Sequence, residues 1–348
     1  MITKIRVLSQ QLARPSFGSA RDLVSWMGAM QAQDYTMQKW AVGIRLKSGT
    51  IGKVEKALNN GEILRTHVMR PTWHLVAAED IRWMLKLSAK RIRSACDSWH
   101  KGQDMPLGLE SKSFRLMEKI MEGNKSLTKQ EIAEEFNKAG IVTDDPLIKR
   151  LLINAETEGL VCSGVEKKNK PTYALLEERV APVKELHKEE ALAKLALNYF
   201  RSHSPATFED FLWWSGLNIT EARQAIGFIE GELMKERFAS SEFYVHSSCN
   251  KKAKRPGVFH LMPAYDEYLI SYKDRSAAMD VNHYPKAFTN YGIFFPVVMH
   301  NGRIVGNWKK VMKKGKIDID ISFIDENFKT EPELIEVAKN KYLKFLGQ

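Results

Sequence analysis

The chain has 348 residues, of which 44% are hydrophobic and 27% are charged, and this balance excludes an intrinsically disordered protein. Its length allows two or three modest domains, each with a core of its own. The formal net charge of +11 favours a polyanionic partner over a small neutral metabolite.

Neither a membrane segment nor a targeting sequence is predicted. No apolar run approaches the roughly 20 residues that a membrane-spanning helix needs. Residues 1–15 alternate charged and apolar side chains and lack the apolar core of a signal peptide, so we expect a cytoplasmic protein. The cysteines Cys96, Cys162 and Cys249 are scattered without the paired spacing of a metal site, and we interpret them as reduced.

The first elements expected are a helix near residues 5–13 and a helix that begins at Asp22. The second helix leads into Met30-Gln31-Ala32-Gln33-Asp34, where two glutamines interrupt an otherwise apolar stretch. Neither amide ionises, yet each offers an acceptor oxygen and two donor hydrogens, enough to hold a water molecule in one orientation. Gln31 and Gln33 are therefore the first candidate site residues.

The backbone conformation decides whether the two amides can act together. Residues i and i+2 lie about 200° apart on a regular helix but on one face of an extended segment. The pair therefore predicts that the helix ends near Gln31. If the helix continued, Gln31, Asp34 and Gln38 would share a face, and Asp34 would become a candidate water-activating carboxylate. A purely structural role, in which both amides satisfy buried backbone groups near a helix end, is the third interpretation.

The chain continues with a helix over 37–46, strands over 63–67 and 72–76, and a strongly basic helix over 79–99. The basic helix fits either a surface that binds the nucleic-acid backbone or an ordinary solvated face. His67 and His74 lie on the two strands without a third ligand, which favours packing or hydrogen bonding over a metal site.

One pattern occurs three times, near residues 22–30, 131–141 and 210–217: an acidic start, a short apolar-periodic helix, and a glycine followed by an apolar residue. In the second copy Thr128 and Glu131 predict a capping box, and Asp144 begins a second helix that ends at Gly159. Two strands, 160–162 and 172–175, follow. The order helix, turn, helix, wing indicates a winged helix-turn-helix unit.

The third copy is expected to follow the same order. Thr207 caps its first helix, Asn218 and Glu221 form a capping box for its second helix, and strands are predicted near 237–246 and 257–262. After Pro263 the pattern changes to strands over 292–299, 303–308 and 317–323, followed by an amphipathic helix over 331–346.

The predicted fold class is therefore α+β, with three tandem winged helix-turn-helix motifs, a C-terminal antiparallel β-sheet or small barrel, and a terminal helix. The predicted domains are a first winged helix with Gln31 and Gln33, a basic helical connector, a second winged helix, a third winged helix and a β-rich C-terminal domain: residues 1–80, 81–110, 111–180, 181–262 and 263–348.

Three lysine-rich runs lie at the predicted tips of hairpins or loops: 167–170, 251–255 and 309–316. Together with the winged helices they indicate duplex nucleic acid as the partner. A helix fits the major groove of a duplex and a wing reaches neighbouring phosphates, although winged helices also serve as protein–protein modules. The candidate DNA-binding residues are Arg65, Arg70, Lys149, Arg150, Lys167, Lys168, Lys170, Arg223, Lys251, Lys252, Lys254 and Arg255.

The residues at 30–34, 65–76, 261–266 with Asp274-Arg275, and 301–308 resemble those of the bacterial winged-helix DNA glycosylases of the AlkZ and YcaQ type, which unhook interstrand crosslinks. The resemblance spans nearly the whole chain. It implies a concave cationic surface made by three winged helices, a glutamine-apolar-glutamine motif that Gln31 and Gln33 match, and a β-hairpin needed for activity, for which 246–260 is a candidate. Pro71 departs from the glycine that often precedes the threonine in the family.

Two amides suit a leaving base that already carries positive charge. An N7-alkylated purine leaves as a neutral base, so no general acid is needed, and amide oxygens can orient the water and stabilise the developing charge on the sugar. We expect a monofunctional DNA glycosylase for such purines, with Gln31 and Gln33 holding the water and Asp34 as candidate support. Uncharged bases should be excised slowly.

The expected partner is damaged duplex DNA, bound by a monomer that needs no metal, nucleotide or other cofactor and that associates with the bacterial nucleoid. The alternatives are a non-catalytic winged-helix DNA-binding protein, which would bind duplex without releasing a base, and a protein-interaction scaffold, which would show no salt-sensitive duplex binding. Asp266 and Glu267 are adjacent acids that could form an acid pair.

Overall fold

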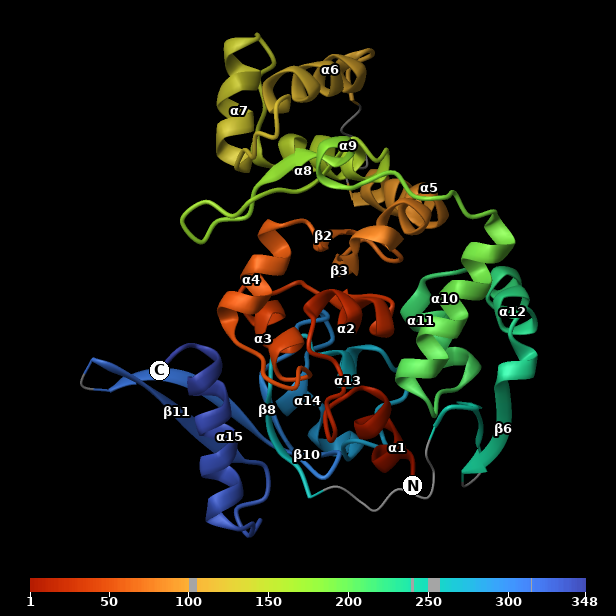
Figure 1. Ribbon diagram of the computed structural model, residues 1–348, viewed down its shortest axis with the longest axis vertical. Helices are drawn as coiled ribbons and strands as arrows, with labels where there is room; N and C mark the ends of the chain where they lie inside the picture. The colour runs from red at the N-terminus through yellow and green to blue at the C-terminus, as the bar shows by residue number, and fades with distance from the viewer. Residues whose placement is uncertain (100–104, 239–240, 250–256, 314) are drawn as a thin grey trace. The chain divides into compact units, whose positions relative to one another are not determined.

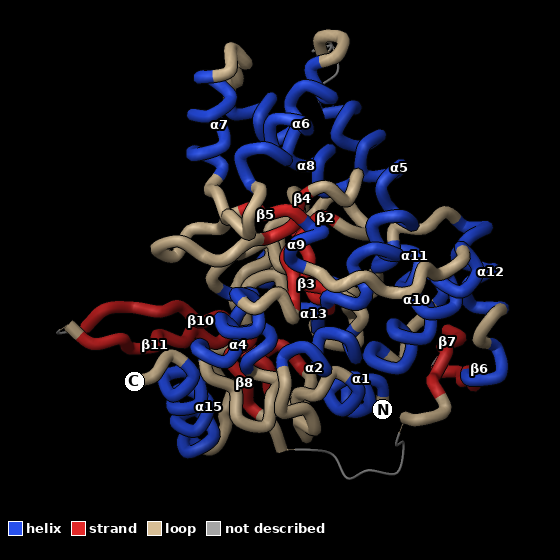
Figure 2. Tube along the Cα trace, turned by 45° about the horizontal axis from the view of Figure 1, so that its top comes forward, coloured by secondary structure: helices blue, strands red, loops and turns tan. Residues whose placement is uncertain are grey.

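The computed structural model describes residues 1–99, 105–238, 241–249, 257–313 and 315–348. It contains helices and antiparallel sheets, which confirms the predicted α+β class (Figures 1 and 2). Packing groups the chain into two compact units, residues 1–55 with 192–348 (unit 1) and residues 56–191 (unit 2). The five-part division by motif stays a prediction.

Unit 2 contains two short hairpins and a helical group. Its first and last helices, α4 and α10, contain the boundaries to unit 1. In chain order the elements are α4 (Ile51–Asn59), β2 (Ile63–His67), β3 (Trp73–Ala77), η1 (Ala78–Asp80), α5 (Ile81–Trp99), α6 (Leu109–Met121), α7 (Lys129–Lys138), α8 (Asp145–Thr157), β4 (Val161–Ser163), β5 (Tyr173–Leu175), α9 (Leu176–Arg179) and α10 (Lys188–His203). β2 pairs with β3 and β4 with β5, both antiparallel.

The expected order of the second motif is present in unit 2. Thr128 and Glu131 form the predicted capping box at the start of α7, and the Asp144 side chain accepts from the Leu147 N–H at the start of α8. The apolar faces of α6, α7 and α8 meet in one buried cluster that includes Met117, Phe136 and Leu151. Local caps and one shared core therefore account for this motif.

Unit 1 contains the two ends of the chain. Its remaining elements are α1 (Ile2–Ser9), α2 (Ala20–Met27), β1 (Met30–Gln31), α3 (Met37–Gly43), α11 (Phe208–Ser215), α12 (Ile219–Gly227), η2 (Glu230–Glu232), β6 (Leu233–Phe238), β7 (Ser241–His246), β8 (Phe259–Met262), α13 (Glu267–Ile270), η3 (Val281–His283), α14 (Tyr284–Ala287), β9 (Val297–His300), β10 (Arg303–Lys313), β11 (Lys316–Phe323) and α15 (Pro332–Phe345). β8 to β11 form an antiparallel sheet in the order β11-β10-β9-β8.

Two strand predictions in unit 1 are wrong. Residues 237–246 and 257–262 do not pair; β7 pairs with β6, and β8 joins the four-stranded sheet beside β9. All four residues of β8 are buried, which suits an edge strand covered by packed elements such as α15 better than a wing with a solvated face. The predicted strand over 292–299 begins only at Val297, because residues 289–293 form a turn in which Gly292 has a φ of +77°.

The hairpin of β10 and β11 carries the third lysine run. Figure 2 shows it as a long two-stranded ribbon, and its pairing continues to Lys313 and Lys316, beyond the residues of β10 that pair with β9. α15 packs against β8, and the Tyr342 ring contacts Trp40 and Trp308 at centroid distances of 5.1 and 4.9 Å. The terminal helix thereby closes the core of unit 1 on the sheet and on α3.

Candidate active site at the glutamine pair

The segment with the two glutamines is not helical, because α2 ends before it; Gln31 ends a short strand and Gln33 lies in the bend after it. Gly28 follows the last residue of α2 with a φ of +79°, and a Cβ at this position would lie 2.9 Å from the Cβ of Asn198. Only glycine fits such a backbone beside a packed helix. Gln31 then lies in β1 with 3% of its surface exposed, and Gln33 is exposed. The continuous helix that would place Gln31, Asp34 and Gln38 on one face is not formed.

Asp34 is bound to the backbone that follows it. One of its carboxylate oxygens, Oδ1, accepts hydrogen bonds from the N–H groups of Thr36, at 2.9 Å, and Met37, at 2.8 Å. Asp34 therefore stabilises the chain where α3 begins, in the manner of a capping residue. Its assignment as catalytic support stays a prediction.

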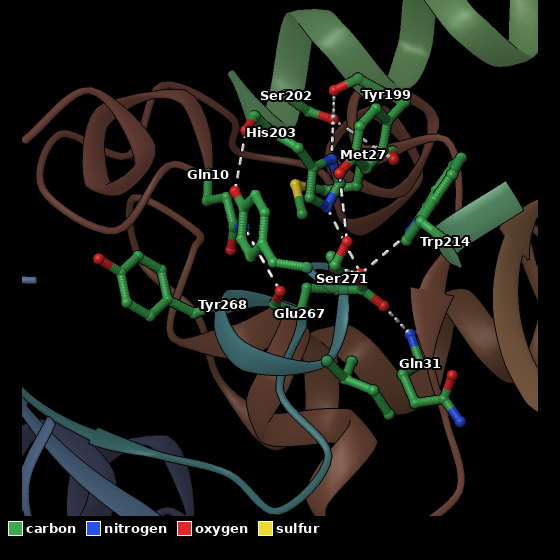
Figure 3. Close-up of polar contacts among 12 residues, drawn as sticks. Gln10, Met27, Gln31, Tyr199, Ser202, His203, Trp214, Glu267, Tyr268 and Ser271 are labelled. Atoms are coloured by element: carbon green, nitrogen blue, oxygen red, sulfur yellow. Dashed lines mark hydrogen bonds and ion pairs between the residues drawn. The ribbon is translucent and has the colours of Figure 1, made fainter. Parts of the chain in front are cut away.

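The backbone of Gln31 is held by a carboxylate that the sequence did not assign to the site. The N–H of Gln31 donates to Oε1 of Glu267, the first residue of α13 (Figure 3). The second oxygen, Oε2, accepts from the indole N–H of Trp214 at 3.2 Å and from the hydroxyl of Ser271. Burying a carboxylate is costly unless such donors surround it, and Glu267 is only 1% exposed.

His203 completes this polar cluster. Its Nε2 lies 3.4 Å from Oε2 of Glu267, its Nδ1 lies 2.7 Å from the hydroxyl of Ser202, and the Tyr199 ring stacks on it at 4.8 Å. Burial lowers the pKa of His203, although the Glu267 carboxylate acts in the opposite direction. A neutral imidazole with its hydrogen on Nε2 fits a carboxylate on one side and a hydroxyl on the other.

Asp266 and Glu267 do not form an acid pair. Both oxygens of Asp266 bind the guanidinium of Arg45, at 2.7 and 2.8 Å, whereas Glu267 binds Gln31, Trp214 and Ser271. Gln10 bridges the two environments, because its Oε1 accepts from Arg45 and its amide group donates to the hydroxyl of Tyr272. These contacts join residues that are far apart in the sequence, so they could not be predicted from it. The sequence shows only that the two acids are adjacent.

Several predicted DNA-binding cations of unit 2 are engaged within the protein. Arg65 on β2 is buried, with its guanidinium 3.9 Å from the centre of the Trp73 ring. On α8, Lys149 pairs with Asp145 at 2.5 Å and Arg150 pairs with Asp97 at 2.8 Å. Each of these three cationic side chains therefore already interacts with a partner inside the protein.

The remaining predicted cations differ in exposure. Lys167 pairs with Glu131 at 3.0 Å, and Arg70 lies half-buried in the turn after β2. Lys168 and Lys170 are exposed in the turn between β4 and β5, and Arg223 is exposed on α12 in unit 1. The residues Lys251, Lys252, Lys254 and Arg255 lie outside the described residues.

Residues 250–256 of the candidate functional hairpin, 246–260, lie outside the described residues, and its flanking strands β7 and β8 belong to different sheets. Among the described residues, no three or more His, Cys, Asp or Glu side chains are grouped so as to hold a metal ion. The described helices include none with the length and apolar character to cross a membrane.

Comparisons with known proteins agree on one family. A family model described as DNA glycosylase AlkZ-like matches residues 24–345. An interstrand DNA cross-link repair glycosylase of Streptomyces sahachiroi is 23% identical over 308 residues, which cover 84% of this chain and 82% of that protein. The solved structure of the Streptomyces sahachiroi DNA glycosylase AlkZ has a TM-score of 0.80 and 20% identity, and covers 99% of this chain and 95% of that one.

Proposed function

This chain belongs to the AlkZ-like DNA glycosylase family, and from that premise we propose that it hydrolyses the N-glycosidic bond of cationic N7-alkylated purines in duplex DNA. The family membership confirms the prediction of a DNA glycosylase, an enzyme with DNA as its substrate. The relative that repairs interstrand cross-links adds crosslinked purines to the proposed substrates. In this proposal Gln31 and Gln33 hold the attacking water.

The observation that carries the proposal is the extended backbone at Gln31. Because α2 ends at Met27, the glutamines are not forced about 200° apart as they would be on a helix. Gln31 lies at the end of β1, and Gln33 is exposed in the bend that follows it. In this proposal the two amide oxygens orient a single water molecule.

The proposed hydrolysis needs no side chain that donates a proton to the leaving base. A cationic purine departs as a neutral base, so what remains is to place water beneath C1′ and to stabilise positive charge on the sugar. Neutral amide oxygens do both, and the water gives its proton to solvent after its oxygen has bonded to C1′. The carboxylate of Asp34 is already bound to the N–H groups of Thr36 and Met37. This supports a substrate range limited to bases that carry positive charge.

Duplex binding is proposed to use the predicted cations, with no cofactor and as a monomer. Lys168, Lys170 and Arg223 are exposed and can contact phosphates directly. Lys149, Arg150 and Lys167 would exchange a carboxylate partner for a phosphate oxygen. Such contacts position the duplex without reading its sequence.

A duplex that contains one N7-methylguanine tests the proposal, with the released base measured by chromatography. The unaltered protein should release the base, and Gln31→Ala with Gln33→Ala should slow release by about 100-fold while the duplex Kd stays within about twofold. Gln130→Ala is the matched control, because it removes an exposed amide on α7, bonded at 3.1 Å to Glu134. Its release rate should be unchanged.

Duplex binding without base release from N7-methylguanine or from a purine crosslink would overturn the proposal and favour a non-catalytic DNA-binding protein. Release at an undiminished rate by the double variant would overturn the role of the two glutamines. Equal release of uracil and N7-methylguanine would contradict the requirement for a cationic base.

A further inference from the structure

We propose that Glu267 is a positioning residue for base excision, acting through the main chain of Gln31. The inference rests on the proposed role of Gln31 in holding the water. Glu267 is 1% exposed and its carboxylate accepts from the Gln31 backbone N–H, so its proposed action on the reaction is indirect. In Figure 3 the amide of Gln31 points away from this carboxylate.

The Glu267 carboxylate joins four parts of unit 1. Oε1 accepts from Gln31 in β1, and Oε2 accepts from Trp214 in α11 and from Ser271 just after α13. His203 at the end of α10 lies 3.4 Å from Oε2. Donors on both oxygens prevent the carboxylate from rotating, so the position of the Gln31 N–H is defined by three other elements.

β1 needs such an external support. It consists of only Met30 and Gln31, far fewer residues than a strand of ordinary length. The turn at Gly28 precedes it directly, and the capping turn of Asp34 follows it. A hydrogen bond from a backbone N–H to an ionised carboxylate is about twice as strong as one to a neutral acceptor. Glu267 therefore adds a charge-assisted anchor to the short strand.

The neighbouring acid shows that burial alone does not explain this arrangement. Asp266 is also buried, but both of its oxygens bind the guanidinium of Arg45, an ion pair that joins α13 to the end of α3. Glu267 instead receives donors from an amide N–H, an indole and a hydroxyl. One of its oxygens, Oε1, is directed at the segment that carries the proposed water-holding amide.

Glu267→Gln is the direct test, because glutamine keeps the size of the side chain but has one acceptor oxygen. Its NH₂ group must face either Gln31 or the donors Trp214 and Ser271. We expect the single-turnover excision rate on the N7-methylguanine duplex to fall by about 100-fold, as for a displacement of about 1 Å at a reacting centre. The duplex Kd should stay within about twofold.

A double variant separates positioning from general structural damage. If Glu267 acts through Gln31, the variant with both Gln31→Ala and Glu267→Gln should excise within about threefold of Gln31→Ala alone, because the amide to be positioned is already absent. Independent effects would multiply instead.

Two adjacent tryptophans on α11 give a matched control. Trp214 donates its indole N–H to Glu267, at 3.2 Å, whereas Trp213 donates to the carbonyl oxygen of Ile270, at 2.9 Å. Trp214→Phe should slow excision by about tenfold, since it removes one of the two donors to Oε2 of Glu267, and Trp213→Phe should not. If Glu267→Gln fails to fold by thermal melting, Ser271→Ala replaces it and should slow excision at an unchanged duplex Kd.

The outcomes distinguish this inference from the proposed function. Normal excision by Gln31→Ala would remove the proposed role of Gln31, and this inference with it. Slow excision by Gln31→Ala together with normal excision by Glu267→Gln, or by Ser271→Ala where it replaces Glu267→Gln, would overturn only the positioning role. Multiplying effects in the double variant, or equal effects of Trp213→Phe and Trp214→Phe, would also overturn it.

Discussion

The backbone N–H of Gln31 donates to the carboxylate of Glu267, which lies 236 residues later in the chain. The bond connects the short strand that carries the proposed water-holding amide to a buried cluster on α10, α11 and α13. The glutamine motif thus depends on residues that belong to other parts of unit 1. A reaction that tolerates little displacement of its water benefits from such a support.

The first prediction concerns the dependence of the excision rate on pH. Because amides do not titrate, the single-turnover rate on N7-methylguanine should vary by less than about threefold between about pH 6 and about pH 9. Rates measured across this range, with a saturating amount of protein at each pH, check the prediction. A bell-shaped profile, or a slope of about one below neutral pH, would instead identify a titrating acid or base at the site.

Asp34 gives the second prediction. Asp34→Asn keeps an oxygen that can accept from Thr36 and Met37, so both stability and excision rate should be retained. Asp34→Ala removes the acceptor and should lower the free energy of unfolding by about 1 kcal/mol, measured by urea denaturation. A large loss of excision in the well-folded Asp34→Asn variant would show that the carboxylate, rather than the capping contact, serves catalysis.

The parts of the fold that could be predicted from the sequence are those stabilised by contacts between residues close together in the chain. The capping box predicted at Thr128 and the cap predicted at Thr207 involve residues three apart, and both are present. At Asn218 the side chain accepts from the Glu221 N–H, which is one half of the capping box predicted there. The partner of β8 could not be found this way, because the strand pairs with β9, more than thirty residues later. The end of α2 was placed too late, since the contact of Gly28 with Asn198 involves a distant helix.

The candidate site also contains residues that the sequence indicates and residues that only the folded structure brings together. Gln31 and Gln33 could be proposed because two amides in an apolar segment are unusual in the sequence itself, and the resemblance to a family points to the same pair. The role inferred for Glu267 could not be predicted, because two of its three donors, Gln31 and Trp214, are far from it in the chain. The ion pairs of Lys149 and Arg150 likewise require the packing of α8 to be known.

The third prediction concerns salt-dependent duplex binding. Lys168 and Lys170 are exposed in the turn between β4 and β5, so changing both to alanine should reduce the slope of log K against log salt by about two. Binding isotherms at several salt concentrations measure that slope. Lys138→Ala with Lys339→Ala removes the same charge from lysines paired with Glu135 and Glu336 and is the control. Equal slope changes in the two variants would contradict a specific role for the turn.

The fourth prediction concerns the ion pair of Arg45 and Asp266. Arg45 is fully buried, and both oxygens of Asp266 bind it, so Asp266→Asn leaves a buried cation without its counter-charge. The free energy of unfolding should fall by about 4 kcal/mol. Asp320→Asn breaks an exposed pair with Lys309, at 3.3 Å, and should cost less than about 1 kcal/mol. Urea denaturation measures both, and equal losses would refute the assignment of Arg45 and Asp266 as a buried structural pair.

The last prediction is acid sensitivity caused by His260 on β8. Its Nε2 lies 2.7 Å from the carbonyl oxygen of Leu12, and burial, followed by the charge of Lys341, lowers its pKa to about 3. The unfolded chain binds a proton near the ordinary pKa of about 6.5, whereas the folded protein does not, so stability is full above that value and falls as the pH decreases towards the folded pKa. Between about pH 7 and about pH 5 the loss from this residue should be about 2 kcal/mol.

His260→Gln isolates that contribution, because a glutamine amide can still donate to the Leu12 carbonyl oxygen but does not bind a proton. The difference in unfolding free energy between the two pH values should shrink by about 2 kcal/mol in this variant, as measured by urea denaturation. His283→Gln changes an exposed histidine and should leave the difference as it was. An unchanged difference in His260→Gln would mean that His260 takes up its proton in the folded state as readily as in the unfolded chain.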